Sequence, residues 1–314
     1  MKKIKDIFIS ISILFIGLII IELALRLINS DMSNYDIEMW KYAKELKTQD
    51  PVLGHVHKKN KEATLQNIDI KLNSFGMRSP EPNPDKKKIL FLGSSISLGW
   101  GIENEDSYAE IVNNRLNEED LNYQVLNASV GNYNTFRYIE NFLRNQTAID
   151  PDIIVINYFL NDAEILPMGS GNFLLKNSEL AASLTIAVKK MIANNKESLD
   201  DHYNTLYKPE NQGFRLMENS LAKLAKYAKT KDIKVYLVLI PDIHFLQDYP
   251  FLPIHNKMNA ISQEYDFEFI DFYETLKGLN FDKLQIIPGD SHPNEYGHNL
   301  IGNKLSDVLI SDLK

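Results

Sequence analysis

Five short apolar runs, alternating with segments of helical spacing, constrain the fold of this chain more than any other feature of its sequence. The runs are rich in Ile, Val and Leu and are nearly continuous, as in strands that are buried on both faces. Such strands belong to parallel sheets, and right-handed crossovers place the connecting helices in two outer layers. The sequence therefore predicts an α/β fold, a three-layer α/β/α sandwich with a five-stranded parallel sheet. The predicted strands are 88–92, 123–127, 153–159, 233–240 and 267–271.

Between and after these strands, apolar residues recur every third or fourth position, which is typical of amphipathic helices. The chain closes on such a segment, which Pro293 and Asn294 introduce as a helix start. The predicted helices are 108–116, 136–144, 214–228, 254–265 and 295–313.

One long insertion, residues 163–213, interrupts the alternation. Insertions at the carboxyl ends of strands are often lids or binding loops, whereas a helix packed at the periphery is an equally good interpretation. Part of the insertion has a helical apolar face, made of Leu180, Leu184, Ala187, Val188 and Met191.

The N-terminus resembles a membrane anchor. Three lysines among the first five residues precede a charge-free run over 7–21, and Glu22 and Arg26 can pair on one face of a helix. A helix over 7–28 would rise about 33 Å, close to the thickness of one hydrocarbon core. We predict an uncleaved anchor with the lysines in the cytoplasm. A cleaved signal peptide is the alternative, although no Ala-x-Ala-like site follows the run.

These features divide the chain into three parts. Residues 1–30 are predicted to form the anchor, residues 31–86 a stalk and N-terminal extension, and residues 87–314 the main domain with its insertion at 163–213. The extension is polar, contains four prolines and includes a turn at 73–79.

Composition excludes several classes of function. The net charge of −8 argues against a nucleic-acid-binding protein, because such a protein needs a surplus of Lys and Arg. The absence of cysteine excludes disulfides, cysteine-based metal sites and thiol catalysis. No group of residues has the spacing of a metal site, so we expect no cofactor.

Polar residues follow the first three strands at the edge where parallel sheets bind ligands. Ser95 follows the first strand, where a nearby backbone N–H can stabilise negative charge. Gly131 follows the second strand, where a glycine lets the backbone approach a ligand. Asn161 follows the third strand, and its amide can donate to an oxyanion. Each residue alone is equally typical of a turn or a helix cap.

The most specific signal is the pair Asp290 and His292, just before the last helix. Residues two apart in an extended segment point the same way, so the carboxylate can orient the imidazole. A serine, oxyanion donors and an Asp–His pair are thus predicted to share one edge of the sheet. This arrangement indicates a Ser–His–Asp hydrolase.

These motifs resemble the SGNH (GDSL) hydrolase superfamily, membrane-anchored bacterial type. The first block is Gly93-Ser94-Ser95 followed by Gly99, the third ends in Asn161-Asp162, and the last covers 290–298. The resemblance implies a flavodoxin-like sandwich and a serine esterase. It further implies the catalytic residues Ser95, Asp290 and His292. The implied oxyanion hole consists of Ser95, Asn161 and either Gly131 or Asn132.

Three positions depart from the family pattern. Ser94 replaces the usual Asp beside the nucleophile, and Phe159 stands where the third block usually has Gly. The second block aligns with a one-residue ambiguity, so either Gly131 or Asn132 occupies the oxyanion position.

The resemblance implies a short acyl ester, often acetyl, on envelope carbohydrate or lipid as substrate. The expected partners are this substrate and the membrane, with no nucleic acid, and the sequence does not indicate an oligomeric state. Three alternatives remain. An O-acetyltransferase would use the same residues, and the Ser94 substitution suggests a non-catalytic relative that binds glycan or a partner. A lipase or thioesterase would need a larger apolar pocket. We expect His298 to cap or pack within the last helix, and His55 and His57 to lie on the surface.

Overall fold

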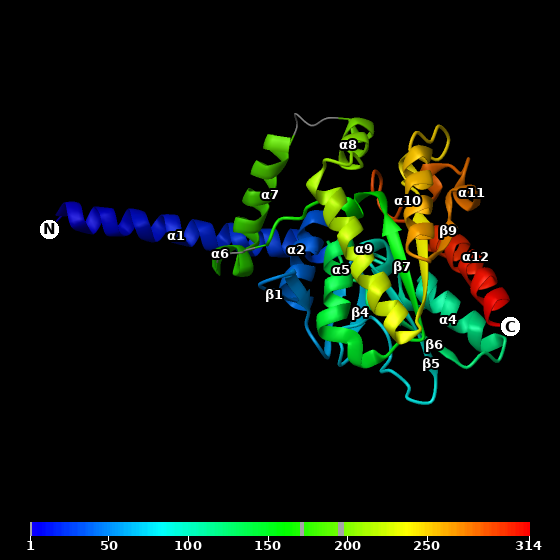
Figure 1. Ribbon diagram of the computed structural model, residues 1–314. Coiled ribbons are helices and arrows are strands. Elements are labelled where there is room, and N and C mark those ends of the chain that lie inside the picture. The colour runs from blue at the N-terminus through cyan, green and yellow to red at the C-terminus, as the bar shows by residue number, and fades with distance from the viewer. Residues whose placement is uncertain (1, 170–172, 194–197) are drawn as a thin grey trace.

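A computed structural model describes residues 2–169, 173–193 and 198–314 of the chain. Its centre is a five-stranded sheet in which all neighbouring strands are parallel, in the order β6-β5-β7-β8-β9 (Figure 1). The predicted parallel sheet is therefore confirmed, with strand ends shifted by at most one residue. The strands are β5 (Lys87–Gly93), β6 (Tyr123–Asn127), β7 (Ile153–Phe159), β8 (Lys234–Ile240) and β9 (Glu268–Asp271).

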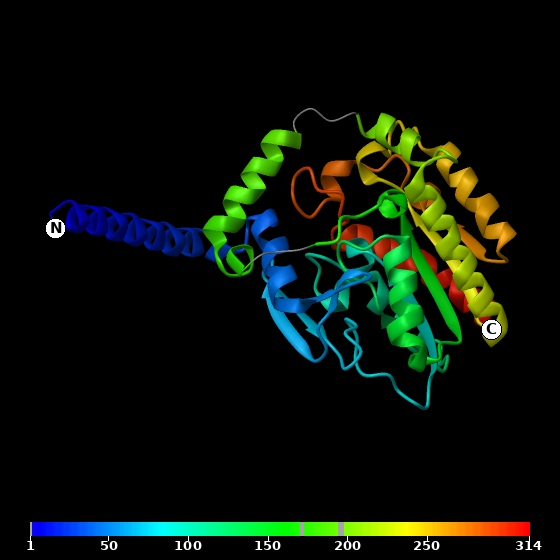
Figure 2. The same ribbon diagram turned by 60° about the vertical axis from the view of Figure 1, so that its left-hand side comes forward.

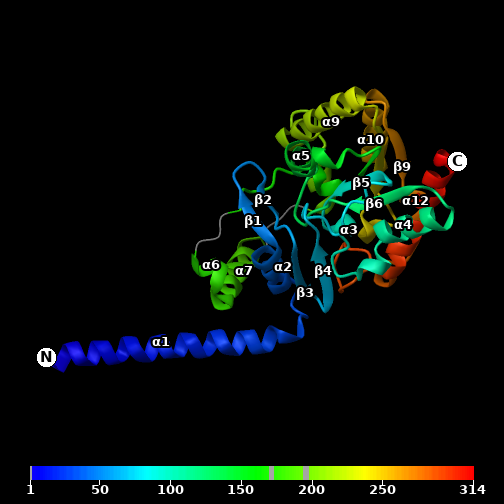
Figure 3. The ribbon, with the colours of Figure 1, turned by 90° about the horizontal axis from the view of Figure 1, so that it is seen from below.

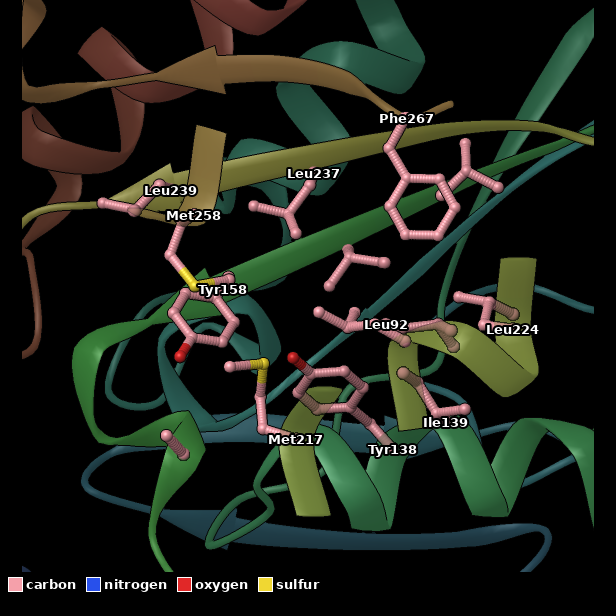
Figure 4. Close-up of a cluster of buried hydrophobic side chains, with 14 of the residues drawn as sticks. Leu92, Tyr138, Ile139, Tyr158, Met217, Leu224, Leu237, Leu239, Met258 and Phe267 are labelled. Atoms are coloured by element: carbon pink, nitrogen blue, oxygen red, sulfur yellow. The ribbon is translucent and has the colours of Figure 1, made fainter. Parts of the chain in front are cut away.

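Helices cover both faces of this sheet, as the alternating side chains of its strands require. Ile89 and Phe91 of β5 pack with α4 (Tyr108–Glu118) and α12 (Glu295–Leu313). Leu90 and Leu92 point to the opposite face. That face is covered by α5 (Thr135–Asn141), α9 (Gln212–Lys231) and α10 (Leu252–Glu264) (Figure 4). The three-layer α/β/α sandwich is thus confirmed.

The segment expected to form a stalk and extension is folded onto the main domain. It contains α2 (Tyr35–Leu46) and two antiparallel hairpins, which lie on the side of the domain that carries the loop after β5 (Figure 3). Tyr42, Leu65 and Ile70 share a buried cluster with Leu98 and Trp100 of that loop. The hairpins are β1 (Lys47–Asp50) with β2 (Gly54–His57), and β3 (Lys61–Leu65) with β4 (Ile68–Leu72).

The first helix, α1 (Lys2–Ile28), projects from the body of the molecule (Figures 1 and 2). The most apolar 18-residue window of the stretch Lys3–Asp31 has a mean hydropathy of 2.7, and none of that window is buried inside the protein. Its length and composition are those of a membrane span or a signal sequence.

The insertion after β7 contributes α6 (Phe173–Asn177), α7 (Glu179–Ala193) and α8 (Leu199–Leu206). The helical face predicted over 180–191 lies on α7, which contacts both α1 and α2. Two short helices, α3 (Ser95–Leu98) and α11 (Tyr273–Leu276), complete the fold.

Candidate active site

Ser95 lies at the topological switch point of the sheet, where the chain runs from β5 to β6 on one side and then crosses back to β7 on the other. β5 is paired with β6 on one side and with β7 on the other, and ligands of such sheets bind outside this point. β5 ends at Gly93, and Ser95 begins α3 two residues later. A Cβ atom on Gly93 would collide with the Ser97 hydroxyl and meet the carbonyl oxygen of Asn157. The glycine therefore lets the serine helix approach β7 closely.

The hydroxyl of Ser95 lies beside His292, and His292 lies beside Asp290. Ser95 Oγ is 2.7 Å from His292 Nε2, and His292 Nδ1 is 2.7 Å from Asp290 Oδ1. The His292 backbone N–H also donates to Asp290 Oδ1, at 3.3 Å. With Nδ1–H donating to the carboxylate, the lone pair on Nε2 faces the serine hydroxyl. This is the arrangement in which an imidazole can take a proton from a serine.

The extension covers this Asp–His pair. The ring of Tyr35, from α2, lies 6.2 Å from the ring of His292. Burial raises the pKa of Tyr35, and the negative charges of Asp290 and Asp36 add to the effect, so the phenol stays neutral. Within the described residues, the second carboxylate oxygen of Asp290 is buried without a hydrogen-bond partner. Tyr35 therefore packs against the ring of His292, whose Nδ1 and backbone N–H both contact the Asp290 carboxylate.

Gly131 and Asn132, the two candidates for the oxyanion position, have different surroundings. The Gly131 N–H donates to the hydroxyl of Tyr42 at 2.9 Å. The Gly131 carbonyl accepts from Lys47 Nζ at 2.6 Å and is 3.2 Å from His55 Nε2. Asn132 has a φ of 61° and lines the cavity beside Ser95. The extension thus occupies both backbone groups of Gly131, whereas Asn132 borders the space that a substrate can enter.

A cavity of about 180 Å³ opens in front of Ser95. Its walls come from the loops after β5, β6 and β7 and from the segment that carries His292. Two of the positions that depart from the family pattern border it: Phe159 is a buried wall, and the side chain of Ser94 does not cap α3. The lining residues include Ser94, Ser95, Asn132, Tyr133, Phe159, Asn161 and Leu166.

Arg78, which the sequence analysis did not single out, holds the loop after the serine helix. It is 2% exposed, and its guanidinium donates to the carbonyls of Leu98 at 3.1 Å, Gly99 at 2.6 Å and Ile102 at 2.7 Å. Burial lowers the pKa of Arg78 to about 10. The sequence predicted a turn over 73–79, which contains this residue, but no spacing or periodicity indicated a role for the arginine itself.

Lys47 and Tyr42 form a second support that sequence reasoning missed. Lys47 Nζ lies 4.1 Å from the centre of the Tyr42 ring, and burial lowers the pKa of this ammonium well below its usual value. Both side chains belong to the extension and contact Gly131.

The expected surface position of His57 is wrong. Its side chain is 7% exposed, with Nε2 2.6 Å from the Tyr42 hydroxyl and Nδ1 2.8 Å from the Gly76 carbonyl. Burial lowers the pKa of His57 to about 3. His55 is half-buried and also contacts the oxyanion loop.

His298 packs within the last helix, as expected. It is buried, stacks on Tyr108, and accepts the Tyr108 backbone N–H on Nδ1 at 3.1 Å. Burial lowers the pKa of His298 to about 3. Among the described residues no three His, Asp or Glu side chains are grouped so that they could hold a metal ion.

The model of the GDSL-like Lipase/Acylhydrolase family matches residues 91–300. Among curated proteins no sequence matches the chain.

Several solved structures are similar to this chain at low sequence identity. One is TesA, with 16% identity and a TM-score of 0.49, covering 73% of this chain and 100% of TesA. Another is the psychrotrophic esterase EstA from Pseudoalteromonas sp., with 18% identity and a TM-score of 0.45, covering 73% of this chain and 99% of EstA. The acetyl xylan esterase AlAXEase has 15% identity and a TM-score of 0.45, covering 70% of this chain and 98% of its own.

Proposed function

Because the chain belongs to the GDSL-like lipase/acylhydrolase family, whose members hydrolyse esters, we propose that it removes short acyl groups through an acyl-enzyme on Ser95. The observation that carries the proposal is the hydrogen-bonded series from Ser95 through His292 to Asp290, with both contacts at 2.7 Å. A serine hydroxyl is a weak nucleophile until a positioned base accepts its proton, and this series supplies that base.

In the first half of the reaction, Ser95 Oγ attacks the ester carbonyl while its proton passes to His292 Nε2. The imidazolium then gives this proton to the leaving alcohol as the carbon–oxygen bond of the ester breaks. In the second half, a water attacks the acyl-serine, loses its proton to His292 and releases the acid. Asp290 fixes the tautomer of the imidazole and stabilises its charged form.

We assign the oxyanion donors to the backbone N–H groups of Ser95 and Asn132 and to the side-chain amide of Asn161. Asn132 and Asn161 line the same cavity as Ser95. Asn132 is preferred to Gly131, because the N–H of Gly131 already donates to Tyr42. Donors that are fixed before the reaction stabilise the developing charge without reorganisation.

The cavity favours a short acyl group, with acetyl as the first candidate. Its volume of about 180 Å³ is small for an acyl-chain site, and Phe159 and Leu166 form apolar walls in it. Asn132, Asn161 and Glu164 give the rest of the lining polar groups suited to a hydroxyl-rich alcohol such as a sugar. With α1 as an uncleaved anchor and its lysines in the cytoplasm, the site would face cell-envelope carbohydrate or lipid.

An O-acetyltransferase is the nearest alternative, because a sugar hydroxyl can replace water in the second half-reaction. A non-catalytic binding protein is the other alternative, motivated by Ser94 in place of the usual Asp. A binding protein has no need of a serine aligned with an imidazole, so the Ser95–His292 contact favours catalysis.

The test compares the full chain in detergent micelles with its Ser95→Ala variant. We expect the parent to hydrolyse p-nitrophenyl acetate and to be labelled by a fluorophosphonate, and Ser95→Ala to lose at least about a thousandfold in rate. Ser220→Ala is the matched control, because the hydroxyl of this buried serine donates to the Leu216 carbonyl within α9, and its loss should leave both signals intact. A folded parent without either signal would refute the esterase proposal. Formation of an acetylated oligosaccharide after an unacetylated oligosaccharide is added as acceptor would identify a transferase.

A further inference from the structure

Helix α7 leaves an apolar stripe uncovered. Leu184, Val188 and Met191 follow one another at four- and three-residue intervals, so they lie on one face of the helix. They are 60%, 54% and 76% exposed. The preceding helix α6 adds two more exposed apolar side chains, Phe173 and Leu174. A contiguous apolar surface of this kind usually marks an interaction site.

The start of α7 is bonded to the apolar helix α1. The carboxylate of Glu22 accepts the backbone N–H groups of Glu179 at 3.0 Å and Leu180 at 2.9 Å, and the Ser178 hydroxyl at 2.8 Å. Arg26 pairs with Glu22 and donates to the carbonyl of Asn177. The anchor helix therefore supplies the cap of α7, which fixes α7 relative to it.

The position of this cap coincides with the expected end of a membrane span. A hydrocarbon core is crossed by about 20 helical residues, so a span that begins after the N-terminal lysines ends near Arg26, which takes part in this cap one turn beyond Glu22. In Figures 1 and 2, α7 lies across the axis of α1, near the end of α1 that joins the main body. With α1 along the membrane normal, α7 would lie in the plane of the membrane surface.

The other side of α7 faces the catalytic domain. Ser183, Ile186 and Lys190 border a small cleft whose opposite wall is α2, and Lys190 pairs with Asp36 of α2. The stripe lies on a different face of the helix. Lys189 is exposed about 100° around the helix from Val188, and a lysine outside the apolar face suits anionic lipid headgroups. An apolar face, an exposed lysine outside it and an orientation across an anchor together describe an interfacial membrane helix.

We propose that α6 and α7 lie in the lipid interface of the leaflet from which α1 emerges, and so hold the catalytic domain against the membrane. The proposal rests on the anchoring role of α1 in the proposed function. Its consequence for the site runs through α2, because Asp36 contacts α7 while Tyr35, the preceding residue, covers His292.

Because the chain has no cysteine, single cysteines can be introduced and labelled selectively. The full chain is placed in phosphatidylcholine–phosphatidylglycerol vesicles with an environment-sensitive fluorophore at Val188→Cys. We expect quenching by lipids that carry a spin label near the headgroup, and little quenching by aqueous iodide. Lys229→Cys, exposed on α9, is the matched control and should show the opposite pattern.

A third label at Leu14→Cys reports whether α1 is inserted. Quenching by lipid at Leu14 with iodide quenching at Val188 would overturn this inference and leave the anchor intact. Absence of lipid quenching at Leu14 would overturn the anchor and this inference together. If unlabelled Val188→Cys forms disulfide cross-links efficiently and the labelled protein shows no quenching by lipid, a second copy covers the stripe and lipid contact is refuted.

Discussion

The hydroxyl of Tyr42 lies 2.9 Å from the backbone nitrogen of Gly131 and 2.6 Å from Nε2 of His57. The hydroxyl accepts from the Gly131 N–H and donates to His57 Nε2. His57 in turn donates from Nδ1 to the carbonyl of Gly76. A loop of the catalytic domain is thus hydrogen-bonded to a buried part of the N-terminal extension.

Replacing this hydroxyl should weaken both the fold and the reaction. Tyr42→Phe leaves a buried N–H without an acceptor, which costs about 1–3 kcal/mol in the free energy of unfolding. The loop is then free to move, so kcat for p-nitrophenyl acetate should fall more than KM changes. The matched control is Tyr236→Phe, because the hydroxyl of Tyr236 donates to Asp312, away from this loop. An unchanged kcat in Tyr42→Phe would show that the loop does not depend on this bond.

Arg78→Lys should also lower kcat, although it keeps the positive charge. The guanidinium serves three carbonyls in the loop after the serine helix, and an ammonium cannot reproduce that fork. We expect a loss of about 1–3 kcal/mol in stability, measured by urea unfolding, because at least one buried carbonyl loses its donor. Arg115→Lys is the control, because this partly buried arginine of α4 bonds to α12, away from that loop. Equal behaviour of the two variants would contradict this role.

The stability of the protein should fall in mild acid, in part through His298. Its folded pKa of about 3 lies below the ordinary value near 6.5, so the unfolded chain binds the proton first. Stability is therefore lost as the pH falls from about 6.5 towards 3, by about 2 kcal/mol for one such histidine between about pH 7.5 and pH 5. His298→Gln keeps an acceptor for Tyr108 and should flatten the dependence of the free energy of unfolding on pH.

His244 provides a control of opposite sign. Its hydrogen bond to Asp242 raises the pKa of His244, so its protonation stabilises the folded state in acid. His244→Gln should therefore steepen the acid loss. If both histidine variants behave like the parent, neither group is responsible for the acid sensitivity.

Asp162→Asn should become more stable than the parent as the pH rises. Burial raises the pKa of Asp162 well above the ordinary value near 3.9, so the folded state retains the proton and ionisation costs stability. The parent therefore loses stability as the pH rises from about 4 through the folded pKa, and the neutral amide does not. The amide oxygen can still accept the Phe159 N–H. Urea unfolding over a pH series checks this, and a pH-independent difference would refute it.

The sequence predicted the sheet well where local and tertiary preferences agree. The strand 153–159 matches β7 at both ends, because an unbroken run of large apolar residues can only be buried. The last helix matches α12 at both ends, because Asn294 caps it by accepting from Gly297. Ser95 and His292 were expected at one edge of the sheet because parallel strands end there, and they lie in contact.

The extension was harder to predict because its burial depends on partners that are distant in sequence. His57 is buried only because Tyr42 and Gly76 surround it, and no pattern within its hairpin indicates this. The apolar face of α7 was recognisable at positions such as Leu184 and Val188, but spacing alone cannot say whether protein, lipid or water covers it.

The connection between α1 and α2 spans only residues 29–34, and Asn29 within it is buried and bonded to Glu179. Fully extended, six residues reach about 20 Å at most, and this segment is folded rather than extended. With α1 in a bilayer, Ser95 would therefore be held at a fixed height above the lipid. Turnover would then follow the number of acyl esters per unit area of membrane, not their bulk concentration. Esters carried deeper in the envelope would be out of reach, however abundant they are.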